Sequence, residues 1–411
     1  MNHLYKSILA LGLAAGALAS CKKELDDYYA TAPTGGYANL TLPGSTTLVT
    51  KYAPGETIPL TLGYNAGDSP SGITVFQATR TDSAQAGSYP INGTFNQTLG
   101  VTAQTVPYIV PATYAVGTAV RVDVTLTFAN GGRQLRRFTY TVGASPTLTN
   151  GTPTLTYRNG LAASAQADND LLGYTVVLNA GGVSTGTGTN LFKAVDSLVY
   201  SARTGSTGAL RRQGVVRSPT AGVANTRTLD VRIPAGSAAA GGAQFVFTAY
   251  AQSTSTTLTS VLVPVAAATP LATTRRGTLS FGAGSTPDSL AFNLSTGLNE
   301  PAANPATAKD LQVSGLASTG ALTLSAPSAT RYYKLTSAQL TAAPYATASA
   351  NAVGLLLYQN TLSADLGTPA VGDVYAGRLR GTGAPLLLRI VGVRASTSGS
   401  VGRVRFEYRS L

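Results

Sequence analysis

The segment PATYAVGTAVRVDVTLTFANGGRQLRRFTYTV, from Pro111 to Val142, decides the fold because its pattern returns 123 positions later. The second copy is PAGSAAAGGAQFVFTAYAQSTSTTLTSVLVPV, from Pro234 to Val265. At this offset apolar residues fall on apolar residues: Val122 on Phe245, Val124 on Phe247, Leu135 on Leu258, Phe138 on Val261, Tyr140 on Val263 and Val142 on Val265. Most of these positions are two apart, which is the period of a strand with one buried face. Each copy is therefore predicted to end in a β-hairpin.

The turns of the two hairpins, and a turn upstream, extend the repeat. Asn130-Gly131-Gly132 is predicted to turn the first hairpin, and the Ser/Thr-rich tract 253–257 the second. Upstream, the run LGYNAG at 62–67 resembles VLNAG at 177–181, at a shorter offset than the hairpins. The second copy therefore carries an insertion, which we place in the Gly/Thr tract 181–190.

Repeating units of roughly 105 to 120 residues, with short strands and no helical period, favour antiparallel sandwiches. They resemble the immunoglobulin-like modules of bacterial surface proteins, although they lack the disulfide and core tryptophan of antibody domains. The predicted fold class is all-β, with two immunoglobulin-like sandwiches followed by a third antiparallel β domain. We expect the domains at residues 38–144, 145–268 and 274–411.

The last domain does not continue the repeat. Its predicted strands are 278–281, 289–294, 353–358, 373–380, 386–393 and 401–408. In the last of them Val404, Phe406 and Tyr408 alternate with charged residues, which predicts one buried and one solvated face. The segments AFNLSTG at 291–297, KDL at 309–311, GDVY at 372–375 and FEYR at 406–409 resemble C-terminal β domains of Bacteroidota lipoproteins, a resemblance that carries no activity.

The first twenty residues form an export signal. Lys6 is followed by the apolar run ILALGLAAGALA at 8–19, which is shorter than the roughly 20 residues of a membrane-spanning helix. The run ends in Leu18-Ala19-Ser20-Cys21, which resembles the lipobox of bacterial lipoproteins, and Cys21 is the only cysteine. The resemblance implies a signal peptide over 1–20, acylation of Cys21 that attaches the chain to a membrane, and a lipidated tether over 21–37.

The charged run KKELDD at 22–27 resembles the surface-export signal of outer-membrane lipoproteins from Bacteroidota. That resemblance implies a lipid-anchored position in the outer membrane, facing the cell exterior. A solvated tether is the alternative interpretation of the same charges.

Removal of the signal peptide and acylation of Cys21 leave a chain without His, Met, Trp or a free thiol. Histidine-dependent Ser or Cys catalysis is thereby excluded, and zinc, copper, haem and iron–sulfur sites lose their usual ligands. We therefore expect no cofactor and no enzymatic activity, with a carboxylate-based hydrolase as the minor alternative. The G-x-S-x-G match at 182–186 is interpreted as a loop, because no histidine can act as its base. Asp168 and Asp170 are weak calcium candidates, and an Asx turn is the favoured interpretation.

The composition also favours recognition of anions. The formal charge is +12, and most of the basic residues are arginines, which bind carboxylate and phosphate in a bidentate manner. The candidate glycan- or anion-binding residues lie in the last domain: Arg378, Arg380, Arg389, Arg403, Arg405, Arg409, Tyr332 and Tyr333. A solvated sheet face is the alternative for the arginines, and a core position for the tyrosines. Nucleic acid is not an expected partner, because no recognisable motif for it is present.

Three Asp-Ser-aliphatic sequences, at Ser83, Ser197 and Ser289, resemble the O-glycosylation sequon of Bacteroidota. Two functions remain open at this point. One is a non-enzymatic surface lipoprotein that binds extracellular glycan, acidic polysaccharide included, for an outer-membrane transporter. The other is a structural or adhesive envelope protein that binds other proteins.

Overall fold

The computed structural model describes residues 33–42, 51–183, 191–219, 223–282, 285–342, 344–397 and 400–411. The signal peptide, Cys21, the charged run after it and most of the tract 181–190 lie outside these residues. Strands dominate the described part, so the all-β fold class is confirmed. None of the helices in it has the length and apolar character to cross a membrane. The chain divides into two compact units, residues 1–144 with 183–193 and residues 145–182 with 194–411.

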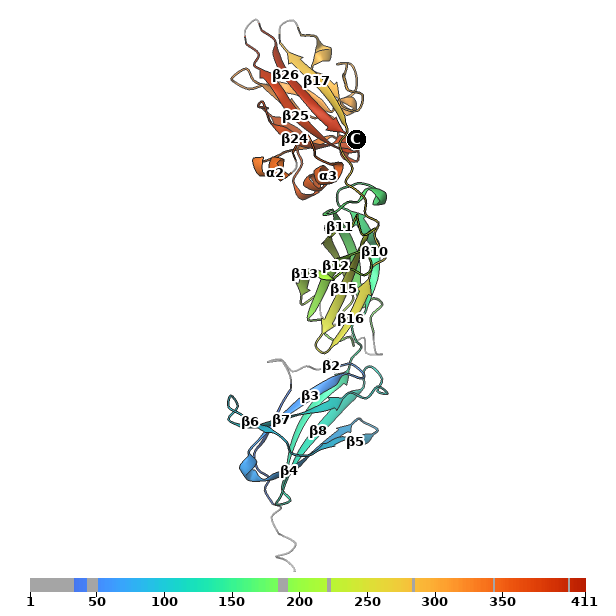
Figure 1. Ribbon diagram of the computed structural model, residues 1–411, viewed down its shortest axis with the longest axis vertical. Helices are drawn as coiled ribbons and strands as arrows, with labels where there is room; N and C mark the ends of the chain where they lie inside the picture. The colour runs from blue at the N-terminus through green and yellow to red at the C-terminus, as the bar shows by residue number, and fades with distance from the viewer. Residues whose placement is uncertain are drawn as a thin grey trace, which may run out of the picture. The chain divides into compact units, whose positions relative to one another are not determined.

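The first unit contains a sandwich of two sheets whose strands are antiparallel except for the pair β2 and β9 (Figure 1). One sheet has the order β1-β3-β7-β6, and the other has the order β2-β9-β8-β4-β5. Their strands are β1 (Ala38–Thr41), β2 (Lys51–Tyr52), β3 (Thr57–Tyr64), β4 (Pro70–Ala78), β5 (Ser83–Tyr89), β6 (Thr94–Asn96), β7 (Val101–Ile109), β8 (Ala119–Phe128) and β9 (Arg133–Val142). Strands β8 and β9 form the predicted hairpin, with Val122, Val124, Phe138 and Tyr140 in the core.

The predicted insertion of the second repeat is confirmed, and part of it belongs to the first unit. Five residues separate β3 from β4, whereas the segment between β11 (Leu171–Leu178) and β12 (Ser197–Thr204) runs from Asn179 to Asp196. Phe192 of this segment forms a parallel bridge with Ala144. Lys193 is almost completely buried, and its Nζ lies 2.5 and 2.7 Å from the two carboxylate oxygens of Glu56.

The second sandwich, in the second unit, has sheets of order β10-β11-β14 and β13-β12-β15-β16. Its remaining strands are β10 (Leu148–Tyr157), β13 (Arg211–Arg217), β14 (Asn225–Arg232), β15 (Ala243–Ala251) and β16 (Thr254–Thr259). The predicted hairpin is β15–β16, with Phe245 and Phe247 fully buried. Its turn lies one residue earlier than the predicted tract, because Gln252 adopts the left-handed conformation and Thr254 already pairs.

The C-terminal domain packs two five-stranded sheets around one core (Figure 1). The first sheet has the order β17-β26-β25-β24-β22 and the second β19-β18-β20-β21-β23. The strands are β17 (Thr273–Phe281), β18 (Ala291–Asn293), β19 (Leu298–Asn299), β20 (Leu311–Leu316), β21 (Leu322–Ser325), β22 (Arg331–Lys334), β23 (Asp365–Gly367), β24 (Val374–Arg378), β25 (Pro385–Arg394) and β26 (Gly402–Ser410). Val404, Phe406 and Tyr408 of β26 are at most 1% exposed, so the predicted alternation is confirmed.

The strand predicted at 353–358 is wrong, because these residues belong to helix α3 (Ala350–Gln359). Ser349 caps this helix by accepting a hydrogen bond from the backbone N–H of Ala352. Val353 and Leu357 are four apart and both buried, so the apolar run faces its core with helical spacing. The shorter α2 (Ser337–Ala342) precedes it, and both helices lie at one end of the first C-terminal sheet (Figure 1).

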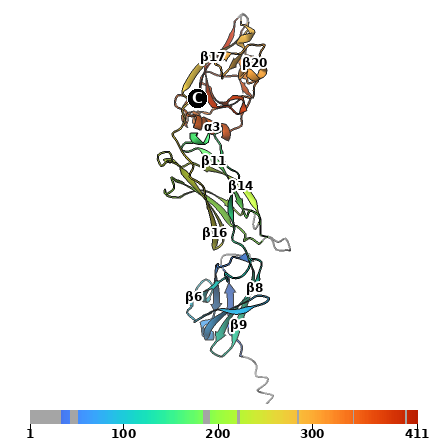
Figure 2. The same cartoon turned by 90° about the vertical axis from the view of Figure 1, so that its right-hand side faces the viewer.

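Helix α3 lies next to the end of the second sandwich that holds β11 (Figure 2), and a buried polar network joins the helix to the loop before β11. The Asn351 amide donates to Asp170 at 2.7 Å and to the carbonyl of Ala165 at 2.7 Å. Asn159 also donates to Asp170, at 2.9 Å. Burial raises the pKa of Asp170, and these hydrogen bonds offset part of that rise. The second sandwich and the C-terminal domain thus share a desolvated, hydrogen-bonded junction.

Candidate functional site

The outer face of the first C-terminal sheet is divided between a helix and a group of arginines. On the β24 side, Leu387, Val374 and Ala376 pack with α3 in an apolar cluster. Further along β25 and β26 the same face carries Arg394, Arg403 and Arg405, which are all exposed. Helix α3 therefore covers one part of the face and leaves the arginine-bearing part open.

Arg394, Arg403 and Arg405 line a groove of about 420 Å³ together with Val371, Val391, Gly392 and Val393; we call it the arginine groove. Arg403 lies opposite Arg394, and Arg405 opposite Gly392. A Cβ on Gly392 would lie 2.8 Å from Nε of Arg405, so the absence of a side chain there lets this guanidinium cross the neighbouring strand. Val371 is 65% exposed and gives the groove an apolar contact.

The three arginines of the groove make no ion pair with any acid in the described residues. Glu407, two residues after Arg405 on β26, is ion-paired: it contacts Arg389 and lies 3.7 Å from Arg276. One carboxylate is thus shared by two guanidiniums. The Arg389 guanidinium also stacks 4.5 Å above the ring of Tyr345, whose pKa is raised by burial. Positive charge therefore exceeds negative charge along this face, and the excess lies on the three arginines of the groove.

Arg378 and Arg380 do not join the predicted patch. Arg378 donates to the carbonyl of Asn159 at 3.0 Å, so it belongs to the junction with the second sandwich, and burial lowers its pKa. The predicted strand ends at residue 378 instead of 380, and Arg380 has a left-handed backbone that breaks the alternation. Its guanidinium turns to the fully buried Asp310, at 3.2 Å. Arg409 is also engaged, because it donates to the carbonyls of Tyr345 and Ala346.

The two candidate tyrosines face opposite sides of β22, as neighbours in a strand do. Tyr332 is 2% exposed and donates to the Asp310 carbonyl at 2.8 Å, so its assignment to a surface platform is wrong. Tyr333 is half-buried against the α3 cluster and donates to Gln339. Neither ring lies in the arginine groove.

The carboxylates proposed for calcium are used by the protein itself. Asp168 accepts hydrogen bonds from the backbone N–H groups of Gly236 and Ala238. Asp170 accepts from Ala167, Asn159 and Asn351. In the described residues no group of three or more His, Cys, Asp or Glu is arranged to hold a metal ion.

The three serines of the glycosylation sequons differ in exposure. Ser83 is exposed at the start of β5, whereas Ser197 is half-buried at the start of β12. The hydroxyl of Ser289 donates to the carbonyls of Ser280 and Thr286. Ser83 therefore presents the most accessible hydroxyl of the three.

Arg394 and Arg276 fall just outside the predicted strands, one of which ends at residue 393 and the other of which begins at residue 278. In the structure β25 extends to Arg394 and β17 begins at Thr273. The alternation itself is the signal that could have found them, because both arginines continue the pattern of their strands onto the charged face.

No protein-family model matches the chain, and no curated protein matches it. Among solved structures, a DUF4466 family protein from Parabacteroides merdae is similar at 11% identity and a TM-score of 0.21, over 66% of this chain and 100% of that one. A segment of two fibronectin type-III domains from chicken tenascin has 10% identity and a TM-score of 0.19, with coverages of 55% and 97%. A tetra-tandem repeat from the extending region of a large adhesion protein has 9% identity and a TM-score of 0.20, with coverages of 86% and 72%.

Proposed function

We propose that this chain is a non-enzymatic, lipid-anchored outer-membrane protein that binds acidic extracellular polysaccharide through the arginine groove. The observation that carries the proposal is the cluster of Arg394, Arg403 and Arg405 around an open groove, without an acid paired to any of them in the described residues. Clustered guanidiniums repel one another, and an anionic ligand relieves that repulsion.

The shape of the groove favours a polymer of acidic sugars. The three arginines are exposed along the groove, and exposed Val371 and Val391 lie beside them. Arginine forks bind carboxylates in the plane of the guanidinium, and valines accept the C–H face of a sugar ring. A chain of uronic acid units supplies both kinds of contact at regular intervals.

The membrane location is supported by the sequence, since the lipobox-like residues 18–21 end an export signal. Acylation at Cys21 would tether the β domains to the outer membrane by their N-terminal end. The run at 22–27 supports the outward-facing orientation, which suits a protein that captures polymer for a transporter in the same membrane.

Binding of the soluble mature chain, from Lys22 onward, to polygalacturonate and alginate tests the proposal, with dextran as the neutral comparison. We expect binding to the two acidic polymers, and a loss of about ten- to a hundredfold in Arg403→Gln with Arg405→Gln. Arg80→Gln with Arg133→Gln is the matched control, because it removes two exposed arginines of the first unit. If both double variants lose the same affinity for the acidic polymers, binding depends on the overall charge of the chain and not on the arginine groove.

If the wild-type chain binds neither polygalacturonate nor alginate, the second candidate function is favoured, that of a structural or adhesive envelope protein. Co-purification with outer-membrane proteins from the native host is the measurement that follows in that case. The mass of the natively purified chain also tests O-glycosylation, for which we propose Ser83 because of its exposure. A mass equal to that of the bare lipidated chain would refute the modification.

A further inference from the structure

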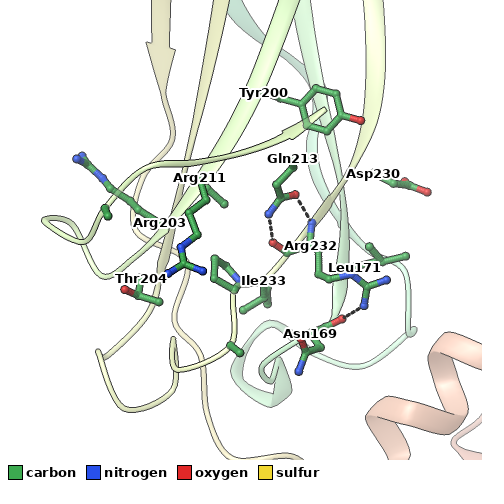
Figure 3. Close-up of a pocket in the computed structure, with 14 residues that line it drawn as sticks. Asn169, Leu171, Tyr200, Arg203, Thr204, Arg211, Gln213, Asp230, Arg232 and Ile233 are labelled. Atoms are coloured by element: carbon green, nitrogen blue, oxygen red, sulfur yellow. Dashed lines mark hydrogen bonds between the residues drawn. The ribbon is translucent and has the colours of Figure 1, made fainter. Parts of the chain in front are cut away.

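The second sandwich contains a pocket of about 640 Å³ at the ends of β12, β13 and β14 (Figure 3). Its size falls within the roughly 300 to 1,000 Å³ of small-molecule sites. The floor is apolar and includes Leu171, Ala202 and Ile233, of which Ala202 and Ile233 are at most 1% exposed. Three arginines line its sides: Arg203, Arg211 and Arg232.

The walls of this pocket come from the edge strands of two different sheets, and one glutamine fastens them together. Gln213 of β13 accepts a hydrogen bond from the backbone N–H of Arg232 at 2.7 Å and donates to the Arg232 carbonyl. Figure 3 shows this pair of hydrogen bonds beside the pocket. The side chain thus replaces the backbone pairing that β13 and β14 cannot make. A fixed spacing of the walls reduces the entropy that a ligand would lose on binding.

The arginines of the pocket differ in whether other residues of the protein bind their guanidiniums. Arg203 donates to the side chain of Gln244, and Arg232 donates to the carbonyl of Asn169 at 2.8 Å. Both are thereby held in place. Arg211 is exposed, and it has no ion-pair partner in the described residues. The acid in the lining, Asp230, is occupied by Arg158 at 2.8 Å and by the Tyr358 hydroxyl at 2.9 Å.

We infer that this pocket is a second binding site, for a short oligosaccharide that carries carboxylates. Arg211 and Arg232, on opposite walls, would bind the carboxylates, and the apolar floor would contact the sugar rings. The site does not depend on the arginine groove, because all its residues belong to the second sandwich.

Titration calorimetry of the mature chain with trigalacturonate, and with maltotriose as the neutral comparison, tests this site. We expect wild-type binding of trigalacturonate alone and at least a tenfold loss of affinity in Arg211→Glu. Arg212→Glu is the matched control, because Arg212 is the exposed neighbour on β13 and does not line the pocket. Arg211→Lys should retain part of the affinity, since it keeps the charge but loses the fork.

The groove variant Arg403→Gln with Arg405→Gln separates the two sites. It should keep trigalacturonate binding at the pocket even if polymer binding at the groove is lost or never observed. No binding by the wild-type chain at about 10 mM trigalacturonate would overturn the inference. Equal losses in Arg211→Glu and Arg212→Glu, with unchanged melting temperatures, would overturn it as well.

Discussion

Replacement of Lys193 by Met should destabilise the first sandwich, although Lys193 stands in the sequence between two strands of the second. Its Nζ lies 2.5 and 2.7 Å from the Glu56 oxygens, and the two side chains are 2% and 1% exposed. Glu56 also accepts the backbone N–H of Ala53 at 2.7 Å. Removal of one partner of a buried ion pair takes this partner from the other charge and typically costs about 3–5 kcal/mol. The free energy of unfolding of the first unit should fall by that amount.

Hydrogen exchange measured by mass spectrometry is the suitable assay, because it reports the first unit separately and needs no tryptophan. A loss of about 3–5 kcal/mol corresponds to a fall of two to three and a half orders of magnitude in protection of β2 and β9, at about 1.4 kcal/mol per tenfold. Lys334→Met is the control, since Lys334 lies outside the first unit and its side chain is 54% exposed, so that its ion pair with Asp373 is worth about 1 kcal/mol or less.

The double variant Glu56→Gln with Lys193→Met completes the cycle. It removes both charges, keeps an acceptor for the Ala53 N–H, and should recover most of the lost protection. A fall of less than tenfold in Lys193→Met, or no recovery in the double variant, would show that the buried pair does not stabilise the first sandwich in this way.

Three further changes test the second unit. Burial raises the pKa of Asp170 above its usual 3.8, so folding favours the protonated carboxyl. The stability that this proton contributes is full below pH 3.8 and is lost as the pH rises through the folded-state pKa. Asp170→Asn should remove this part of the pH dependence of the melting temperature, and identical pH profiles of the two proteins would contradict it. Gly354→Ala should cost about 1–3 kcal/mol, because its Cβ would lie 2.3 Å from the carbonyl oxygen of Asn159, and calorimetry of the mature chain measures the loss. Arg380→Gln should lower the stability of the C-terminal domain by about 1–3 kcal/mol, since it leaves the buried carboxylate of Asp310 without its cation, while polysaccharide affinity stays unchanged.

The sequence contained enough to predict the sandwiches, because their cores depend on local alternation. Val122 and Phe245 mark equivalent buried positions in the two repeats, and both are fully buried in the structure. Alternation also placed Phe406 in the core and Arg405 outside it. These features depend only on the two-residue period of a strand.

Helix α3 and the division of the arginines required information that lies far away in the sequence. A short apolar run is ambiguous between strand and helix, and Ser349 as a cap was the local sign that it is a helix. The strand alternation that places Arg378 on the charged face could not show that its guanidinium would donate to the carbonyl of Asn159. The pocket of the second sandwich was equally hidden, because Gln213 and Arg232 come together only through the edges of two sheets.

The affinity of the mature chain for polygalacturonate, measured at about 0.1 M and about 1 M salt, decides whether the arginine groove binds an acidic polymer. The variant for comparison carries Gln at Arg394, Arg403 and Arg405 together. The Debye screening length between exposed charges is about 10 Å at the lower salt concentration and about 3 Å at the higher one. We expect tight, strongly salt-sensitive binding by the wild-type chain, and weaker binding with a smaller salt dependence by the variant, whose remaining affinity comes from the pocket of the second sandwich. Equal affinity and equal salt dependence in the two proteins would contradict this expectation.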